Sequence, residues 1–164
     1  MPRPYLIQIE LTFPNLKNEG YQVTSPPESY YNCIAWAAGD PDRYWSPIPR
    51  DQSDSGYAGQ YEEYWPGVKQ ENTVESWMDA LAKIGFEACS AANPESGIQK
   101  IAIYTDDQGE PQHVARQLPN GGWTSKLGDD CDIEHKTLTA LEGEQYGHAR
   151  FFMKRPAHIE LIRG

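Results

Sequence analysis

The chain has 164 residues, of which 38% are hydrophobic and 12% aromatic, and its formal net charge is -10. This length fits one domain with a substantial core, and the aromatic content opposes disorder. The negative charge opposes nonspecific binding to nucleic acid or to an anionic membrane, so we expect a neutral or cationic peptide or protein partner.

The cysteines and the absence of long apolar runs indicate a compartment. Cys33, Cys89 and Cys131 show no spacing typical of a disulfide framework, which favours free thiols in a reducing cytoplasm. A disulfide between Cys89 and Cys131 stays open as an alternative. No stretch has the pattern of a signal peptide or of a transmembrane helix, so we expect a cytoplasmic protein, with export by a signal-free route left open.

The N-terminal segment reads as a strand followed by an arm. Apolar residues alternate with polar ones over residues 7–13, the pattern of a half-buried strand, and Pro14 ends it. Residues 15–29 then read as an arm around the domain. We therefore predict a single domain over residues 1–164, with the strand and arm within residues 1–29.

The next segment predicts a short helix that begins with a cysteine. Asn32 can cap a helix over residues 33–38, and Gly39 with the following Asp-Pro stops it. Cys33 then lies in the first turn, where free N–H groups and the macrodipole favour a thiolate. That effect contributes roughly 0.3–1 kcal/mol, less than one pKa unit, so we expect a cationic imidazolium to lower the thiol pKa further.

Residues 40–67 show no convincing periodicity and are rich in proline and aromatic residues. The aromatic residues are Tyr44, Trp45, Tyr57, Tyr61, Tyr64 and Trp65. A loop of this length is usually functional or disordered, and the aromatic residues favour an ordered one. Two interpretations stand side by side: a satellite core, or the wall of a substrate groove beside Cys33 formed by Trp36, Trp45 and Trp65.

The remaining chain predicts one helix and an antiparallel meander. The capping-box spacing at Thr73 precedes a helix over residues 74–84. Strands are predicted over residues 86–89, 98–105, 112–118, 123–127 and 150–154, and a short helix over 138–141. This order predicts an α+β fold, with N-terminal helices packed on an antiparallel β-meander.

His113 is the histidine that we select as a candidate base, because it opens a well-defined hairpin strand and so has a rigid mount. Its alternative is a hydrogen-bonded edge residue. His135, His148 and His158 lie in less regular contexts, and we interpret them as structural or exposed.

The segments Asn32–Ala37, His113–Ala115 and 123–128 together resemble the papain-like thiol hydrolases, with the compact NlpC-type and CHAP-type amidases nearest, as a divergent member of a bacterial family. The resemblance implies a papain-like fold with Cys33 as nucleophile and His113 as base. The backbone N–H of Cys33, with the Asn32 amide or the hydroxyl of Tyr30 or Tyr31, would form the oxyanion hole.

The residue that orients the imidazole has two candidates. Asp132 is our first choice, and Ser125, on the strand that follows His113, is the second. If residues 120–122 form a three-residue loop, 117 pairs with 125, and Ser125 shares a sheet face with His113. A two-residue loop would place Ser125 on the opposite face.

Metal binding is weakly indicated, because Cys131 and His135 have a Cys-x3-His spacing but the sequence shows no second pair of ligands. We expect neither metal nor cofactor. The sequence favours a cysteine-dependent amidase or peptidase acting through an acyl-enzyme, with deamidation or acyl transfer at the same site. The alternative is a catalytically silent acidic interaction or immunity module on the same scaffold, with Cys33 as core.

Overall fold

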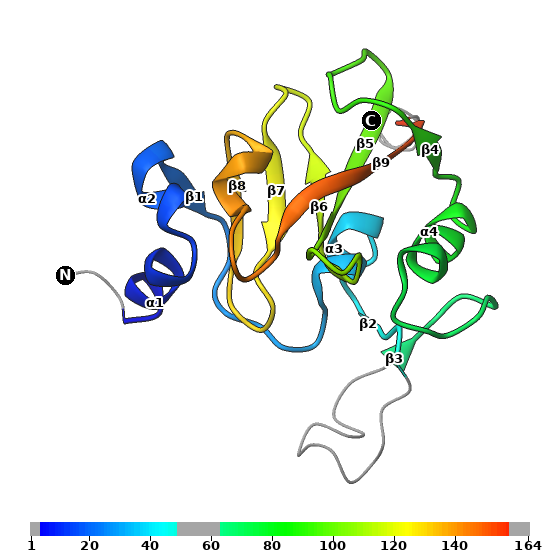
Figure 1. Cartoon of the computed structure of the whole chain (residues 1–164), viewed down its shortest axis with the longest axis horizontal. Coiled ribbons are helices and arrows are strands. Elements are labelled where there is room, and N and C mark those ends of the chain that lie inside the picture. The colour runs from blue at the N-terminus through cyan, green and yellow to red at the C-terminus, as the bar shows by residue number, and fades with distance from the viewer. Residues whose placement is uncertain (1–3, 49–62, 158–164) are drawn as a thin grey trace, which may run out of the picture.

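A computed structural model describes residues 4–48 and 63–157 (Figure 1). Helices and strands are mixed, as predicted, and seven strands form one sheet in the order β1-β8-β7-β6-β5-β9-β4, each pair antiparallel. The elements are α1 (Pro4–Thr12), α2 (Pro14–Glu19), β1 (Tyr21–Val23), α3 (Cys33–Ala38), β2 (Tyr44–Trp45), β3 (Glu63–Tyr64), α4 (Val74–Ala82), β4 (Glu87–Cys89), β5 (Ile98–Thr105), β6 (Pro111–Gln117), β7 (Trp123–Lys126), β8 (Asp132–His135), η1 (Leu138–Leu141) and β9 (His148–Pro156).

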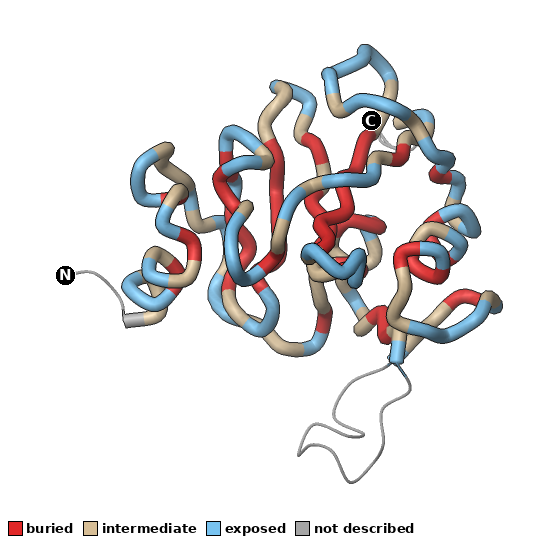
Figure 2. Tube along the Cα trace, in the orientation of Figure 1, coloured by how far each residue is buried: buried red, intermediate tan, exposed pale blue. Residues whose placement is uncertain are grey.

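The central strands carry a hydrophobic cluster on each face, and buried residues gather there in Figure 2. Because strand side chains alternate between faces, β5 contributes to both clusters. Ile101 and Ile103 pack with α3 and α4, whereas Ala102 and Tyr104 pack with residues of α1, α2 and η1. Within the described residues, no helix is both long and apolar enough to cross a membrane.

Helix α3 forms for the reasons that the sequence gives. The Asn32 side chain accepts a hydrogen bond from the backbone N–H of Ala35 at 3.1 Å, and Gly39 ends the helix in the left-handed conformation at φ 78°. Its buried residues, Ile34, Ala35, Ala37 and Ala38, face the sheet, and the helix packs on β6 and β7. Cys33 therefore starts a helix whose end is held against these two strands.

The β6–β7 hairpin has the predicted loop length but a different register. Arg116 pairs with Thr124 and Gln117 with Trp123, so 117 does not pair with 125. The Leu118 N–H donates to the Gly122 carbonyl at 2.7 Å, which makes residues 119–121 the three-residue loop, one position earlier than predicted. Residue 117 pairs with 123 instead of 125, a shift of two residues, so Ser125 still projects from the predicted face of the sheet.

The predicted strand over residues 7–13 is wrong, because this segment lies in helix α1 and the turn after it. Ile9 and Phe13 are buried and four residues apart, and Leu16 of α2 is buried three residues further on, whereas Ile7 and Leu11 are exposed. The predicted arm over 15–29 contains most of α2 and the edge strand β1, which pairs with β8. A short alternating run is compatible with the period of a strand, about 2 residues, and with that of a helix, about 3.6 residues. Here the burial of Ile9 and Phe13 stabilises the helix.

The aromatic segment over residues 40–67 is partly described, since Tyr57 and Tyr61 lie outside the described residues, as does His158. Strands β2 and β3 pair in parallel, and Trp45 is buried at 1% exposure in the cluster beside α3. This residue is therefore core, as the first interpretation predicts. The predicted helix over 74–84 and strands over 86–89, 98–105, 112–118, 123–127 and 150–154 correspond to α4, β4, β5, β6, β7 and β9.

Candidate functional site

His113 lies completely buried near the start of β6, on the face opposite α3. Its ring stacks on that of Tyr146 with centroids 4.2 Å apart and planes at 4°, and Tyr104 contacts it edge-on at 5.3 Å. Its Nε2 lies 3.0 Å from the Oγ of Ser125. Ser125 therefore shares the face of His113 and contacts its ring, as the hairpin argument predicts.

A second buried histidine continues this contact. The Oγ of Ser125 lies 2.8 Å from Nε2 of His135, and Nδ1 of His135 lies 2.9 Å from the carbonyl oxygen of Thr137. A carbonyl only accepts, so His135 carries its proton on Nδ1 and accepts at Nε2. Ser125 then donates its single hydroxyl proton to His135 and accepts from the Nε2–H of His113.

The direction of this hydrogen-bond chain fixes the tautomer of His113. With the proton on Nε2, Nδ1 is a bare lone pair, and it has no hydrogen-bond partner within the described residues. Burial lowers the pKa of His113 well below its ordinary value, with a smaller effect of His135, and burial lowers the pKa of His135 to about 4. Both rings are therefore neutral at pH 7, and Nδ1 of His113 is a proton acceptor.

Cys33 lies where β6 and β7 have parted. Their pairing covers Arg116 and Gln117 of β6, so the backbone of Val114 is free of β7. The N–H groups of Val114, Ile34 and Cys33 itself all lower the pKa of the thiol, but burial outweighs them and raises it to about 11. The prediction that Cys33 has a depressed pKa is therefore wrong, because the helix end is desolvated by the sheet that it packs on.

The cation that acts on the thiol is a lysine, not an imidazolium. Lys126 is fully buried on β7, and its Nζ donates to the carbonyl oxygens of Glu28, Gly128 and Asp130, at 2.9 Å for Gly128. Burial lowers its pKa, and its charge in turn lowers that of Cys33 by less than burial raises it. Three carbonyl acceptors fix this ammonium group in place.

Asp132, our first choice to orient the imidazole, does not contact His113. It pairs with Lys126 across β7 and β8, one position from the Ser125–Ile133 pair, and so projects from the opposite face. Its Oδ2 accepts a hydrogen bond from the Tyr31 hydroxyl at 2.7 Å, while Oδ1 has no partner among the described residues. Burial raises its pKa, and the Tyr31 hydrogen bond opposes this rise.

Two of the three expected side-chain oxyanion donors, Asn32 and Tyr31, are engaged elsewhere, and the third, Tyr30, is 43% exposed. The Asn32 amide donates to the Trp45 carbonyl at 2.7 Å, and its Oδ1 serves the helix cap. The Tyr31 hydroxyl donates to Asp132. Neither group is free to turn toward a substrate carbonyl without breaking a buried hydrogen bond, which costs about 1–3 kcal/mol.

The tryptophans of the predicted groove contact other side chains of the domain. Trp36 donates from Nε1 to Thr124 at 3.0 Å, and Trp65 packs edge-on against the buried Trp45. A cleft of about 570 Å³ opens instead between β1 and the β6–β7 hairpin, with His135 in its lining. It borders the far end of the histidine chain, not Cys33.

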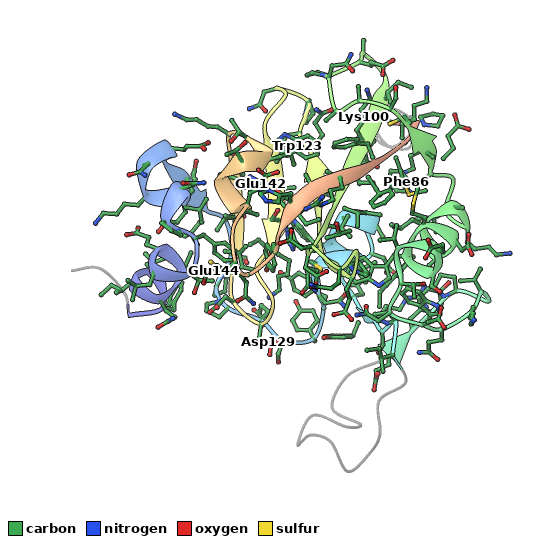
Figure 3. The ribbon with its side chains drawn as sticks, in the orientation of Figure 1. Phe86, Lys100, Trp123, Asp129, Glu142 and Glu144 are labelled. Carbon is green, nitrogen blue, oxygen red and sulfur yellow. The ribbon has the colours of Figure 1, made fainter. Side chains whose placement is uncertain are left out.

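The sequence interpretation missed His135 and Tyr146. His135 lies two residues after the buried Ile133 on β8, so the two side chains share a face of the sheet. The alternation of a strand over these residues was the signal that could have predicted the burial of His135. Tyr146 lies in the loop after η1, together with Glu142 and Glu144 of Figure 3, and nothing local marks it. Among the described residues, no cluster of three or more potential ligands could hold a metal, and the three cysteines are free thiols.

These features define an α+β protein with a cysteine-bearing helix end on one face of a parted strand pair and a directed chain of buried histidines on the other face. The chain belongs to the family described as Domain of unknown function (DUF7689), whose model matches residues 22–154. No curated protein and no solved structure matches it. The matched range contains Cys33, His113, Ser125, His135 and Tyr146, so the whole site lies within the family's domain.

Proposed function

We propose that this protein is a cysteine-dependent amidase or peptidase of papain-like type, in which Cys33 is the nucleophile and His113 the general base. The observation that carries the proposal is the bare, buried Nδ1 of His113. Its tautomer is set by Ser125 and His135. Cys33 starts the helix that packs on the other face of β6, so the proposal requires the thiol and Nδ1 to meet past this strand, where β7 has parted from it. Base, orienting residue and nucleophile are the three parts of such a site.

The resting site is neutral. Moving a proton from a thiol of pKa about 11 to even an ordinary histidine of pKa about 6.5 costs roughly 6 kcal/mol, and burial of His113 adds to it. The thiol is therefore deprotonated as it attacks, by general-base catalysis, and not beforehand.

The chemical steps follow from this arrangement. As the Cys33 Sγ bonds to the substrate carbonyl carbon, its proton passes to Nδ1 of His113, and the C=O π electrons move to oxygen. When the carbonyl re-forms, the leaving amine departs with that proton and leaves an acyl-thioester. Water then attacks with His113 as base again, which releases the acid and restores the thiol. The acidic chain favours a neutral or cationic peptide or protein as substrate, and three free thiols fit a cytoplasmic location.

The test is acylation by p-nitrophenyl acetate at pH 7.5, with acetylation of each cysteine followed by mass spectrometry. Cys33 should acetylate faster than Cys89, and His113→Ala should slow it by about 10²–10⁴-fold. Ser125→Ala leaves the His113 imidazole in place but removes the hydroxyl that fixes its tautomer, and it should slow acetylation of Cys33 about tenfold or more. His148→Ala, at an exposed histidine, is the matched control and should change nothing.

One observation favours the alternative, a silent interaction module: the raised pKa makes Cys33 a poor nucleophile at rest. The two functions separate in the same experiment. If Cys33 acetylates no faster than Cys89, or if His113→Ala leaves its rate unchanged while the protein remains folded, the hydrolase proposal is wrong and the module replaces it.

A further inference from the structure

The proposed base is held from its own side of the sheet, on the face away from the cysteine helix. The His113 ring lies 4.2 Å from the Tyr146 ring, with the two planes at 4°. Tyr104 contacts the same imidazole edge-on, and its Nε2 lies 3.0 Å from the Ser125 hydroxyl. His113 is 0% exposed. The stack on Tyr146 must therefore open before the imidazole turns toward Cys33.

The N-terminal segment, residues 4–20, packs on the outer side of this stack. Phe13, between α1 and α2, contacts the Tyr146 ring with centroids 4.9 Å apart. Ile9, Phe13 and Leu16 are buried and follow the spacing i, i+4, i+7. The three side chains belong to the hydrophobic cluster that contains Tyr146. This is the spacing of anchors with which a helix docks in an apolar groove. The segment therefore covers the histidine face as a docked helical ligand would.

Hydrogen bonds between this segment and the rest of the domain come from α2. The Asn15 amide donates to the Thr139 carbonyl at 3.1 Å, and the Thr137 hydroxyl donates to Glu19 at 2.6 Å. Both bonds are exposed, and an exposed hydrogen bond adds little net stability because water replaces it. Helix α1 has nine residues, a length that is marginal without packing. Both helices also precede the family's domain, which begins at residue 22.

We propose that residues 4–20 are an autoinhibitory clamp, in which Phe13 holds Tyr146 on the His113 ring and so keeps the base away from Cys33. Release of the segment frees the imidazole to reach the thiol past β6. This inference rests on the proposed function and assigns its resting state. The clamp also accounts for Nδ1 of His113, a buried atom with no hydrogen-bond partner among the described residues. Such an atom is costly, and release gives it the thiol as a partner.

The first measurement detects release of the clamp without any reaction at Cys33. Diethyl pyrocarbonate acylates the unprotonated nitrogen of an accessible imidazole, so its rate at His113 reports exposure of that ring. Phe13→Leu keeps an apolar side chain in the cluster but removes the ring that packs on Tyr146. We expect the rate at His113, followed by mass spectrometry, to rise about tenfold, the factor that corresponds to one lost aromatic contact. Leu11→Ala, at a position on α1 that is 71% exposed, is the matched control and should keep the wild-type rate.

The second measurement follows the effect on the thiol. Acetylation of Cys33 by p-nitrophenyl acetate should also be about tenfold faster in Phe13→Leu, and adding His113→Ala should abolish this gain. A merely structural Phe13 would not speed the reaction when it is replaced. Amide hydrogen exchange checks that release is local: in the wild type, α1 should exchange faster than β5, and Phe13→Leu should leave the exchange of β5 unchanged.

The outcomes distinguish this inference from the proposed function. If wild-type α1 exchanges only as fast as β5, or if His113 is not modified faster in Phe13→Leu, the segment is part of the core and the inference is wrong. If modification of His113 rises but acetylation of Cys33 does not, the segment is a cover without inhibition, and the hydrolase proposal stands on its own test. If acetylation is independent of His113 in both wild type and Phe13→Leu, the proposed function fails and this inference fails with it.

Discussion

Acidification should destabilise this protein through the two histidines buried as neutral rings, and the size of the effect follows from His135. Its pKa is about 4 in the folded chain, because of burial, and about 6.5 in the unfolded chain. Between these values the unfolded chain binds a proton that the folded chain refuses, so the free energy of unfolding falls as pH falls. From pH 7 to pH 5 the loss is about 2 kcal/mol for His135 alone.

His113 acts in the same direction, since burial also lowers its pKa. Domains have about 5–15 kcal/mol of stability, so the combined loss is measurable. Urea denaturation at pH 7, 6 and 5 gives the free energy of unfolding, and Asp132, whose pKa burial raises, adds a pH dependence of its own. We therefore compare variants: His135→Gln should lower stability at pH 7 but lose about 2 kcal/mol less than wild type on going to pH 5.

His148→Gln, at an exposed position on β9, is the control and should keep the wild-type pH dependence. Equal pH dependence in His135→Gln and wild type would show that His135 is charged or solvated in the folded chain. The directed hydrogen-bond chain, and with it the assigned tautomer of His113, would then be wrong.

Two further predictions concern Gly147 and Cys33. Gly147→Ala should lower the free energy of unfolding by about 3 kcal/mol or more, because its Cβ would overlap the Thr105 carbonyl. Gly109→Ala, with a similar φ of 83° but in open space, should cost about 1–2 kcal/mol in the same denaturation assay. Equal losses in the two variants would contradict the close packing of Gly147 on Thr105. Iodoacetamide should alkylate Cys33 more slowly than Cys89 at pH 8, with an apparent pKa of about 11 in a pH series, and a Cys33 that reacts faster than Cys89 would show that its thiol is not desolvated.

Local signals carried the parts of the fold that the sequence predicted. Asn32 and Gly39 begin and end helix α3 through hydrogen bonds to residues no more than four positions away. The Asn-Gly turn determines the face of Ser125 despite the shifted register. These features depend on capping and turn chemistry, which a few neighbouring residues determine. The pairing of Cys33 with the His113 strand also came from the sequence, through a resemblance whose catalytic meaning is still a prediction.

The errors have a common cause, since each depended on packing between distant elements. Residues 7–13 satisfied a strand pattern, but burial of Ile9 and Phe13 selected a helix. The position of Asp132 just before the apolar Ile133 favours a carboxylate that faces the site, and only the register of β7 and β8 shows that it projects from the other face. The raised pKa of Cys33 likewise arises from the sheet beneath α3, and no property of the helix end alone predicts its sign.

The Thr137 carbonyl that anchors the hydrogen-bond chain belongs to the backbone, and this has a consequence for how the site can vary among related sequences. Any residue at position 137 presents the same acceptor, so exchange of the Thr137 side chain leaves the proton on Nδ1 of His135. The path of the chain between β8 and η1 is what must persist. An insertion or deletion between Glu134 and Leu138 should therefore be rarer in active relatives than substitution at 137 itself.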